Sequence, residues 1–415
     1  MNRLLKSFIF TLSGVCLLSA VIYWYGVKAE PILVLAPAVN VTDSVTLTIA
    51  QSRIWKLDSL TVPEAIDYYQ VFHSHISGKK YLTFLNRENR MIYYYDLAGG
   101  NLIKVLSLEQ FGFKKGDRIQ GYSILNEDSV FVYDYKSSTL SLISILKGKL
   151  MSRDMVDKVN LGQQSVWPSP FTNRPILWDK TKSELYLAGN FSNEGGMFGS
   201  DKVRNNIVRF NYQSGTVDRL VHYPTFYWGG NWGGGGGLRQ IFYDQNSEKS
   251  LLIISFMADP FLTAYNTQNG QIEKHYAASR YIPHIKSMDY SPIYYEFLDK
   301  LTKIEYYFKT PCYTSVIFDP YRHVYYRFAE LAAKQFDRSQ PLYSHKQKSI
   351  IILNRHFDKI GEILLPQSNY DANNFFVDRD GLYLLKKLET DNHLVFQRFE
   401  LRALKQPKTI SKTQI

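Results

Sequence analysis

The segment with the most unusual chemistry runs from His222 to Gln240 and reads HYPTFYWGGNWGGGGGLRQ. Its aromatic residues are interleaved with seven glycines. Flat rings stack on sugars, on bases or on other side chains, and glycine lets backbone N–H groups approach a ligand closely. The pattern therefore predicts a ligand-binding surface, formed by Tyr223, Tyr227, Trp228, Asn231 and Trp232. The alternative is that the rings fill the wall of the fold and the glycines supply turns.

A second loop, GNFSNEGGMFG at residues 189–199, offers polar partners for the same ligand, namely Asn190 and Glu194. Its oxygens would also suit Ca²⁺, but their spacing is not that of an EF-hand, and a plain polar loop is the simpler interpretation. The glycine runs lack the Lys-Ser/Thr of a P-loop and the βαβ context of a dinucleotide fingerprint. We predict no cofactor and no metal ion.

Hydrolase or lyase chemistry would require two carboxylates, or a His with an acidic partner, facing one cavity. Carboxylates are available at Glu194, Asp289 and Glu296, but the sequence does not bring them together. His73 and His75 would share one face of a strand, yet no third ligand for zinc follows at a recognisable spacing. A binding protein is therefore a better interpretation than an enzyme.

Only two cysteines are present, and Cys312 is the one outside the N-terminal apolar segment. The body of the protein therefore has no internal disulfide. A lone Cys in the β-rich stretch PCYTSVIF is more typical of a small buried apolar residue than of a nucleophile.

Two recurring hairpin patterns must position these loops. In the first, a β-rich run ends in an aromatic residue and Asp or Asn, with Gly or Ser four residues later. Its copies begin at Tyr95-Asp96, Tyr133-Asp134, Phe210-Asn211 and Tyr265-Asn266. The second pattern is an apolar strand, Asn or Asp, a few polar residues and another apolar strand. Its six copies are centred on Asn86, Asn126, Asp179, Asp244, Asp319 and Asp378.

The six copies of the second pattern lie 40, 53, 65, 75 and 59 residues apart. The shorter intervals match four-stranded propeller blades of about 40 to 50 residues, and the longer ones require insertions. We predict an all-β fold, a six-bladed β-propeller, with five or seven blades as alternatives. The first pattern is assigned to strands A and B of a blade, and the second to strands C and D.

The last repeat shows only three clear strands, so it needs a fourth. The alternating segment Val45, Leu47, Ile49 near the N-terminus is predicted to supply it and close the ring. Closure removes exposed sheet edges that would favour aggregation.

Four long insertions should emerge at one end of the propeller, because each joins strand B to C or strand D to the next A. They are residues 190–205, 222–238, 278–313 and 329–348. Long loops on one end of a rigid scaffold commonly carry function, so this end is the predicted functional face. Within the third insertion, residues 291–309 have helical composition, and we expect packing through Leu298 and Leu301.

Composition agrees with a single β-rich body at residues 30–401, because aromatic residues make up 15% of the chain. The formal charge is +11, but the basic residues are scattered, apart from an excess in the tail at 402–415. Scattered charge and predicted export argue against nucleic acid as a partner and favour an anionic lipid or polysaccharide.

The N-terminus carries Arg3 and Lys6 and then runs uncharged from Ser7 to Val27. A helix of this length spans roughly 31 Å, about the hydrocarbon thickness of a bilayer. We therefore predict an N-terminal apolar helix within residues 1–29 that anchors an exported protein. Alternatives are a signal peptide cut after Val27-Lys28-Ala29 and a lipid on Cys16, although Val15 is unsuited to a lipoprotein signal.

The stretch VIFDPYRHVYYRF, with Asp319-Pro320-Tyr321-Arg322, resembles an uncharacterised group of Bacteroidota envelope proteins known as domain of unknown function 4221. The Trp-Gly-Gly loop adds to the resemblance, which spans the exported body. It implies a propeller-like fold, often in lipoproteins, and no activity. From the residues alone, Asp319 and Pro320 suit a turn. Arg322 and Arg327 suit either a ligand or a neighbouring carboxylate.

Together these features predict an envelope-associated propeller that binds a glycan, a peptide or a partner protein through its long-loop end. An exported hydrolase or lyase acting in the central funnel is the first alternative. A purely structural envelope protein is the second.

Overall fold

The structure is a computed structural model that describes residues 29–37, 42–156, 166–191, 205–233, 237–291, 295, 298–335, 346–366, 369–386 and 392–404. The predicted N-terminal helix lies outside these ranges, as does most of the basic tail. Within them, no helix combines the length and apolar character needed to cross a bilayer.

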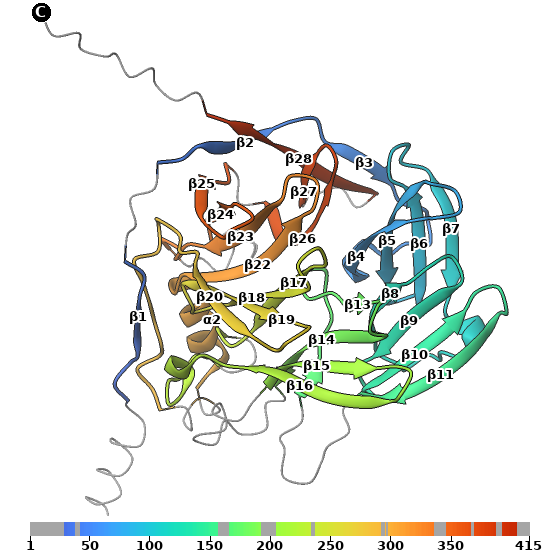
Figure 1. Ribbon diagram of the computed structural model, residues 1–415, viewed down its shortest axis with the longest axis horizontal. Coiled ribbons are helices and arrows are strands. Elements are labelled where there is room, and N and C mark those ends of the chain that lie inside the picture. The colour runs from blue at the N-terminus through green and yellow to red at the C-terminus, as the bar shows by residue number, and fades with distance from the viewer. Residues whose placement is uncertain are drawn as a thin grey trace, which may run out of the picture.

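In this described part of the chain, six antiparallel sheets stand around one axis, as Figure 1 shows. Inner strands of neighbouring sheets contact one another around the centre, as β4 does with β8, β17 with β22, β22 with β26 and β26 with β4. The prediction of an all-β, six-bladed propeller is confirmed. We call the strands of each blade A to D, from the axis outward.

The strands follow the sequence order within each blade. Blade 1 contains β4 (Ile66–His73), β5 (Lys80–Asn86), β6 (Met91–Asp96) and β7 (Leu102–Ser107). Blade 2 contains β8 (Ile119–Ile124), β9 (Ser129–Asp134), β10 (Thr139–Ser144) and β11 (Lys149–Met155). Short 3₁₀ turns precede both, η1 (Pro63–Ala65) and η2 (Glu109–Phe111).

In blade 3, strand A is split into β12 (Val166–Pro168) and β13 (Leu177–Asp179), which pair with opposite ends of β14 (Glu184–Phe191). Its outer strands are β15 (Asn205–Asn211) and β16 (Thr216–His222). Blade 4 contains β17 (Ile241–Asn246), β18 (Leu251–Phe256), β19 (Phe261–Asn266) and β20 (Ile272–Tyr276).

Blade 5 contains β22 (Cys312–Asp319), β23 (Val324–Glu330), β24 (Lys348–Leu353) and β25 (Lys359–Leu364). Blade 6 contains β26 (Tyr370–Asp378), β27 (Gly381–Lys386) and β28 (His393–Ala403). Its fourth strand is β2 (Val45–Ile49), with Leu47 opposite Leu401, and β3 (Arg53–Lys56) pairs with the other half of β28. The predicted closure of the ring by the N-terminal strand is confirmed.

Each blade buries both faces, which explains why the strands read as nearly continuous apolar runs. In β6, Ile92 and Tyr94 pack against blade 2, whereas Tyr93 and Tyr95 pack against blade 6. Alternate residues of a strand point to opposite faces, so a run such as MIYYY fills two interfaces at once. The core is therefore a series of clusters between neighbouring blades.

The Asp and Asn residues of the repeats cap tight turns, as predicted. Asp319 accepts backbone N–H groups of Tyr321 at 2.9 Å and Arg322 at 3.1 Å. Asn211 and Asn266 accept N–H groups two and three residues ahead in the same way. Local side-chain acceptors of this kind stabilise the turn between two strands.

The order of the two patterns within a blade was predicted incorrectly. Asp179, Asp319 and Asp378 end strand A, and Asp244 lies two residues before the end of β17. The second pattern therefore joins A to B, except in blade 1, where Asn86 joins B to C. The first pattern joins C to D, except in blade 2, where Asp134 joins B to C. Both patterns share the same turn chemistry, so neither reveals its position in the blade. In blades 1 and 2 the patterns share a strand, and flanking segments supply β4 and β11.

All four long insertions join B to C or D to the next A, as predicted, so they leave the blades at one end. We call this the insertion end, and the opposite one the turn end. The third insertion contains α2 (Lys300–Lys309), which begins at the N-cap Asp299. The helix packs through Tyr306, Tyr307 and Phe308, whereas Leu301 is 40% exposed. Packing through Leu301 was therefore the wrong expectation.

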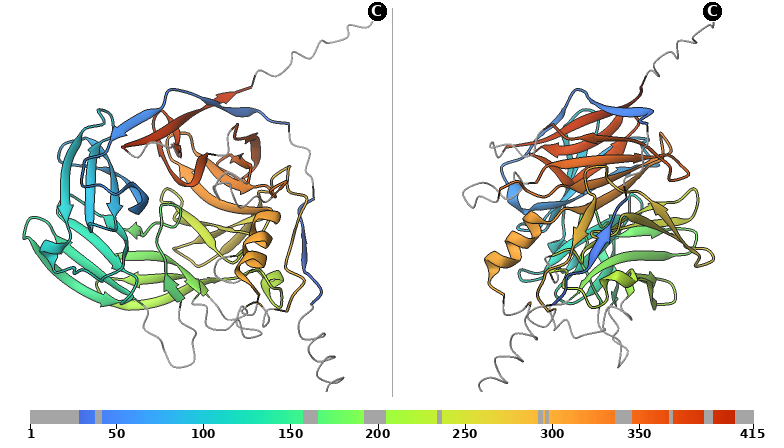
Figure 2. Two further views of the ribbon diagram at one scale, coloured as in Figure 1. Left: turned by 180° about the vertical axis from the view of Figure 1, so that it is seen from behind. Right: turned by 90° about the vertical axis from the view of Figure 1, so that its left-hand side faces the viewer.

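The first described segment follows the outside of blades 4 and 5 (Figures 1 and 2). Its strand β1 (Leu33–Leu35) pairs antiparallel with β21 (His284–Lys286) from the third insertion. Ala29 donates its N–H to the carbonyl of Asp289 at 3.1 Å. The segment then leads to β2, so one stretch of chain connects the outer edges of three blades.

Candidate functional site

The aromatic and glycine-rich segment forms a buried connection between blades 3 and 4. Tyr223, Tyr227 and Trp232 are 3%, 0% and 0% exposed, and Trp228 is half-buried. The ring of Trp232 lies 5.2 Å from that of Tyr227, which belongs to η4 (Thr225–Tyr227). These positions match the alternative in which the rings fill the wall, and stacking of a ligand on them stays a prediction.

Polar groups of this segment also point back into the fold. The Tyr227 hydroxyl donates to the carbonyl of Leu238 at 3.0 Å and accepts the N–H of Ala258 at 2.8 Å. Asn231 is 3% exposed and its amide donates to the carbonyl of Ser291 at 3.3 Å. The segment is thus braced by its own hydrogen bonds.

The second predicted loop lies largely outside the described residues. Glu194 is not described, and of Asn190 only the backbone is, which lies in β14 and pairs with Trp167 of β12. A ligand-binding role for this pair stays a prediction.

The metal-binding potential of the described residues and the chemistry of the lone cysteine can be read from the structure. No cluster of three or more His, Cys, Asp or Glu side chains among the described residues is arranged to hold a metal ion. Burial raises the pKa of Cys312 to about 11, although the Lys346 ammonium 3.3 Å from its Sγ acts in the opposite direction. A buried thiol of this kind is inert.

The centre of the propeller is filled by a tight turn between β12 and β13, which we call the axial turn (residues 169–176). The Tyr68 hydroxyl of blade 1 accepts the N–H of Ile176 at 2.9 Å. The Tyr243 hydroxyl of blade 4 donates to the carbonyl of Pro175 at 2.6 Å. The Asn173 amide donates to Ser315 of blade 5 at 3.1 Å. One segment therefore bridges several inner strands.

Polar side chains of blade 6 complete this arrangement. The amide oxygens of Asn373 and Asn374 accept from Asn173 and from the Thr172 hydroxyl, each at 2.8 Å. Thr172 and Asn173 are 7% and 4% exposed. Hydrogen-bonded polar side chains of the axial turn and blade 6 therefore occupy the propeller axis, where the predicted central funnel would be.

A pocket of about 750 Å³ opens between blades 1 and 2 at the insertion end. It is formed by residues 62–65 and 115–120, which lead into the two A strands, and by the B-to-C turns of both blades. We call it the blade 1–2 pocket. Its lining includes seven charged residues: Glu64, Arg87, Glu88, Arg90, Lys115, Asp117 and Arg118. Its volume is typical of ligand sites.

The inner wall of the blade 1–2 pocket reaches the axial turn. Gln120 donates to the hydroxyl of Ser169 at 2.9 Å, and both residues line the pocket. The pairing of β8 with β9 shifts between Ile119 and Gly121, so Gln120 is the extra residue of a β-bulge. Bulges re-aim side chains at the rims of barrels and beside functional sites.

Two cations of this pocket are available to a ligand. Arg90 is paired with Glu109, and the Asp117 carboxylate accepts the N–H of Lys114 at 2.7 Å. Lys115 and Arg118 are exposed, and neither side chain pairs with another described residue. The pocket therefore offers unpaired cations beside the exposed carboxylates of Glu64 and Glu88.

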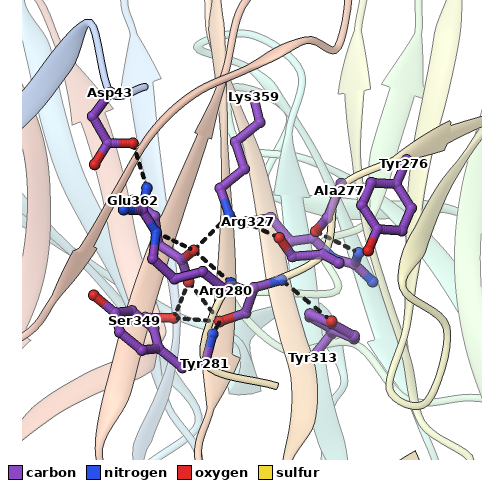
Figure 3. A network of polar contacts seen from close by, with 12 residues as sticks. Asp43, Tyr276, Ala277, Arg280, Tyr281, Tyr313, Arg327, Ser349, Lys359 and Glu362 are labelled. Atoms are coloured by element: carbon purple, nitrogen blue, oxygen red, sulfur yellow. Dashed lines mark hydrogen bonds and ion pairs between the residues drawn. The ribbon is translucent and has the colours of Figure 1, made fainter. Parts of the chain in front are cut away.

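A smaller pocket of about 390 Å³ lies between blades 4 and 5, over a buried carboxylate. Figure 3 shows Glu362, whose carboxylate accepts from Ser349 at 2.9 Å, Lys359 at 2.6 Å and the Arg280 N–H at 2.8 Å. Ser279 donates to it as well. All of these donors are already paired with the Glu362 carboxylate. The cluster therefore serves as a structural link between blades 4 and 5.

Arg327 crosses the same interface and is fully buried. Its guanidinium donates to Ser255 Oγ and to the carbonyls of Asp259, Pro260 and Ala277 at 2.6 to 3.1 Å, and lies 3.9 Å from the ring centre of Tyr313. Burial lowers its pKa to about 10. Its nearest acceptors are thus neutral, whereas Arg322 pairs with the Asp319 carboxylate at 2.9 Å.

The sequence contains a recognisable family domain. A model described as "Domain of unknown function (DUF4221)" matches residues 46–364. The chain belongs to the DUF4221 family. The resemblance seen in the DPYR stretch is confirmed, and the matched region begins at the closing strand β2. A comparison with curated proteins finds no match.

Solved structures agree with the DUF4221 assignment. A crystal structure of a DUF4221 member from Bacteroides vulgatus is 22% identical, covers 87% of this chain and 99% of its own, and has a TM-score of 0.75. A catalytically inactive virginiamycin B lyase from Staphylococcus aureus is 11% identical, covers 84% of this chain and 99% of its own, and has a TM-score of 0.42. The first comparison supports the propeller fold.

Proposed function

We propose that this protein is an exported, envelope-associated binding propeller that holds a polypeptide segment of mixed charge in the blade 1–2 pocket. The observation that carries the proposal is the pocket itself, of about 750 Å³, at the insertion end. It combines the free cations of Lys115 and Arg118 with the exposed carboxylates of Glu64 and Glu88.

The lining favours a peptide over a glycan. Sugar rings are commonly held on exposed aromatic faces, and among the described residues that line the pocket only Tyr135 is aromatic. Side chains of both signs suit an extended peptide, whose own charges and backbone amides they can pair. Electrostatic complementarity of this kind gives specificity and a fast association rate.

The same features support binding rather than hydrolysis. The axial turn occupies the centre, where a catalytic funnel would have to lie. A general acid active near neutral pH needs a raised carboxyl pKa. Burial raises the pKa of Asp244 to about 6 and also raises that of Asp259, but both belong to blade 4, away from the pocket.

Association with the envelope rests on the sequence. The uncharged run from Ser7 to Val27 is long enough to span a bilayer, and the basic residues before it favour a cytoplasmic N-terminus. The propeller would then lie on the exported side, where it meets envelope polypeptides.

The test is a screen of the detergent-solubilised full chain against arrayed peptides of mixed charge, with arrayed glycans beside them. The test variant is Lys115→Glu/Arg118→Glu. Its matched control is Lys147→Glu/Lys149→Glu, which changes the net charge equally at exposed positions of the blade 2 C-to-D turn.

We expect peptides to bind the wild type and the control but not the test variant. Binding of glycans alone, or peptide binding that survives in the test variant, would remove this assignment.

A further inference from the structure

The structure leaves almost no spacer between the propeller and the proposed membrane anchor. The apolar run ends at Val27, and Ala29 is already hydrogen-bonded to Asp289 of the third insertion. Two extended residues span at most about 7 Å. If the anchor is retained, the surface around Asp289 must therefore lie close to the headgroups of the bilayer.

The element that follows Ala29 has a surface suited to that position. In β1, Val34 packs against the core, whereas Leu33 and Leu35 are 52% and 64% exposed. The register places Leu33 opposite Lys286 and Leu35 opposite His284 on β21. Cross-strand partners share one face of a sheet.

The outer face of this ribbon therefore carries two leucines, a lysine and a histidine, and no carboxylate. We call Leu33, Leu35, His284 and Lys286 the ribbon face. Exposed apolar side chains beside basic ones are typical of segments that lie in the interface of a bilayer with anionic lipids. Glu30 is exposed before the ribbon, on the side toward the anchor.

We propose that the ribbon face contacts the lipid surface and fixes the orientation of the propeller on the membrane. The proposal rests on the membrane anchoring stated under the proposed function. Contact with lipid explains why Leu33 and Leu35 are exposed, since they follow the apolar N-terminal segment after only a few residues.

The orientation also bears on the blade 1–2 pocket. The ribbon runs outside blades 4 and 5, and blades 1 and 2 lie across the ring from it, as Figure 1 shows. With the ribbon face against the lipid, the pocket lies on the opposite side of the ring from the attachment point and stays open to polypeptides of the envelope.

The experiment places an environment-sensitive fluorophore on single cysteines of the full chain. Leu33→Cys is compared with Ile103→Cys, because Ile103 is 55% exposed on β7 of blade 1, across the ring. Both variants carry Cys16→Ser, and Cys312 is buried. The proteins are reconstituted in vesicles of phosphatidylcholine and phosphatidylglycerol with a spin-labelled lipid as quencher.

We expect a blue-shifted emission at position 33 and several-fold stronger lipid quenching there than at position 103. Flotation of the vesicles reports anchoring separately. If the protein floats but position 33 is quenched no more than position 103, the ribbon contact is refuted and anchoring stands. If position 33 is shielded without lipid quenching, another protein covers it and the proposal fails. If the protein does not float, both fail.

Discussion

Replacement of the buried Arg327 by methionine should strongly destabilise the propeller. The change leaves the buried carbonyl oxygens of Asp259 and Ala277 without the donor, and the Pro260 carbonyl keeps only the N–H of Ala277. Each orphaned buried acceptor costs about 1–3 kcal/mol. Removal of the buried charge offsets part of this sum, so we expect a net loss of about 3–5 kcal/mol in the free energy of unfolding.

The assay is denaturant unfolding followed by tyrosine and tryptophan fluorescence. The control is Arg209→Met, whose ion pair with Asp218 is partly exposed and should contribute no more than about 1 kcal/mol. Arg327→Lys keeps the charge and some of the hydrogen bonds, so it should fall between the wild type and Arg327→Met. An Arg327→Met protein as stable as the Arg209→Met control would refute the reasoning.

Three further predictions concern buried side chains. Trp232→Ala should cost about 3–5 kcal/mol of stability through the cavity it leaves, measured by unfolding, whereas a stacking role requires lost ligand binding at unchanged stability. Burial raises the pKa of Tyr95 to about 12, so its contribution to stability is complete below about pH 10 and is lost as pH rises through 12. Absorbance titration should show it ionising after the exposed tyrosines; simultaneous ionisation in the folded protein would contradict this. Cys312 should react with a thiol reagent at neutral pH only after unfolding, and rapid reaction in the native state would show that the thiol is accessible.

The turns and the ring closure could be predicted from the sequence because their causes are local. Asp319 caps its own turn, and the alternation of Val45, Leu47 and Ile49 is enough to mark an edge strand. The order of the two patterns within a blade could not be predicted in this way. Turns at Asp179 and Asn211 are chemically alike, although one joins A to B and the other C to D.

The site was less predictable because its residues come from separate turns. Arg87, Lys115 and Ser169 carry no local pattern. Arg87 and Lys115 meet because blades 1 and 2 are neighbours at one end, and Ser169 reaches the pocket from the axial turn of blade 3. The signal that would have helped is the proline-rich stretch WPSPFTNRP, which interrupts strand A of blade 3 and forms the axial turn. A sequence does not distinguish a buried Trp from an exposed one, so the burial of Trp232 could not be predicted from its glycine-rich surroundings.

The most direct test of the central claim is a calorimetric titration of the full chain with the strongest peptide from the array. We predict that Lys115→Glu/Arg118→Glu raises the Kd at least tenfold, a loss of about 1.4 kcal/mol, while Lys147→Glu/Lys149→Glu leaves it unchanged. Equal affinities for the two double variants would show that the blade 1–2 pocket is not the binding site.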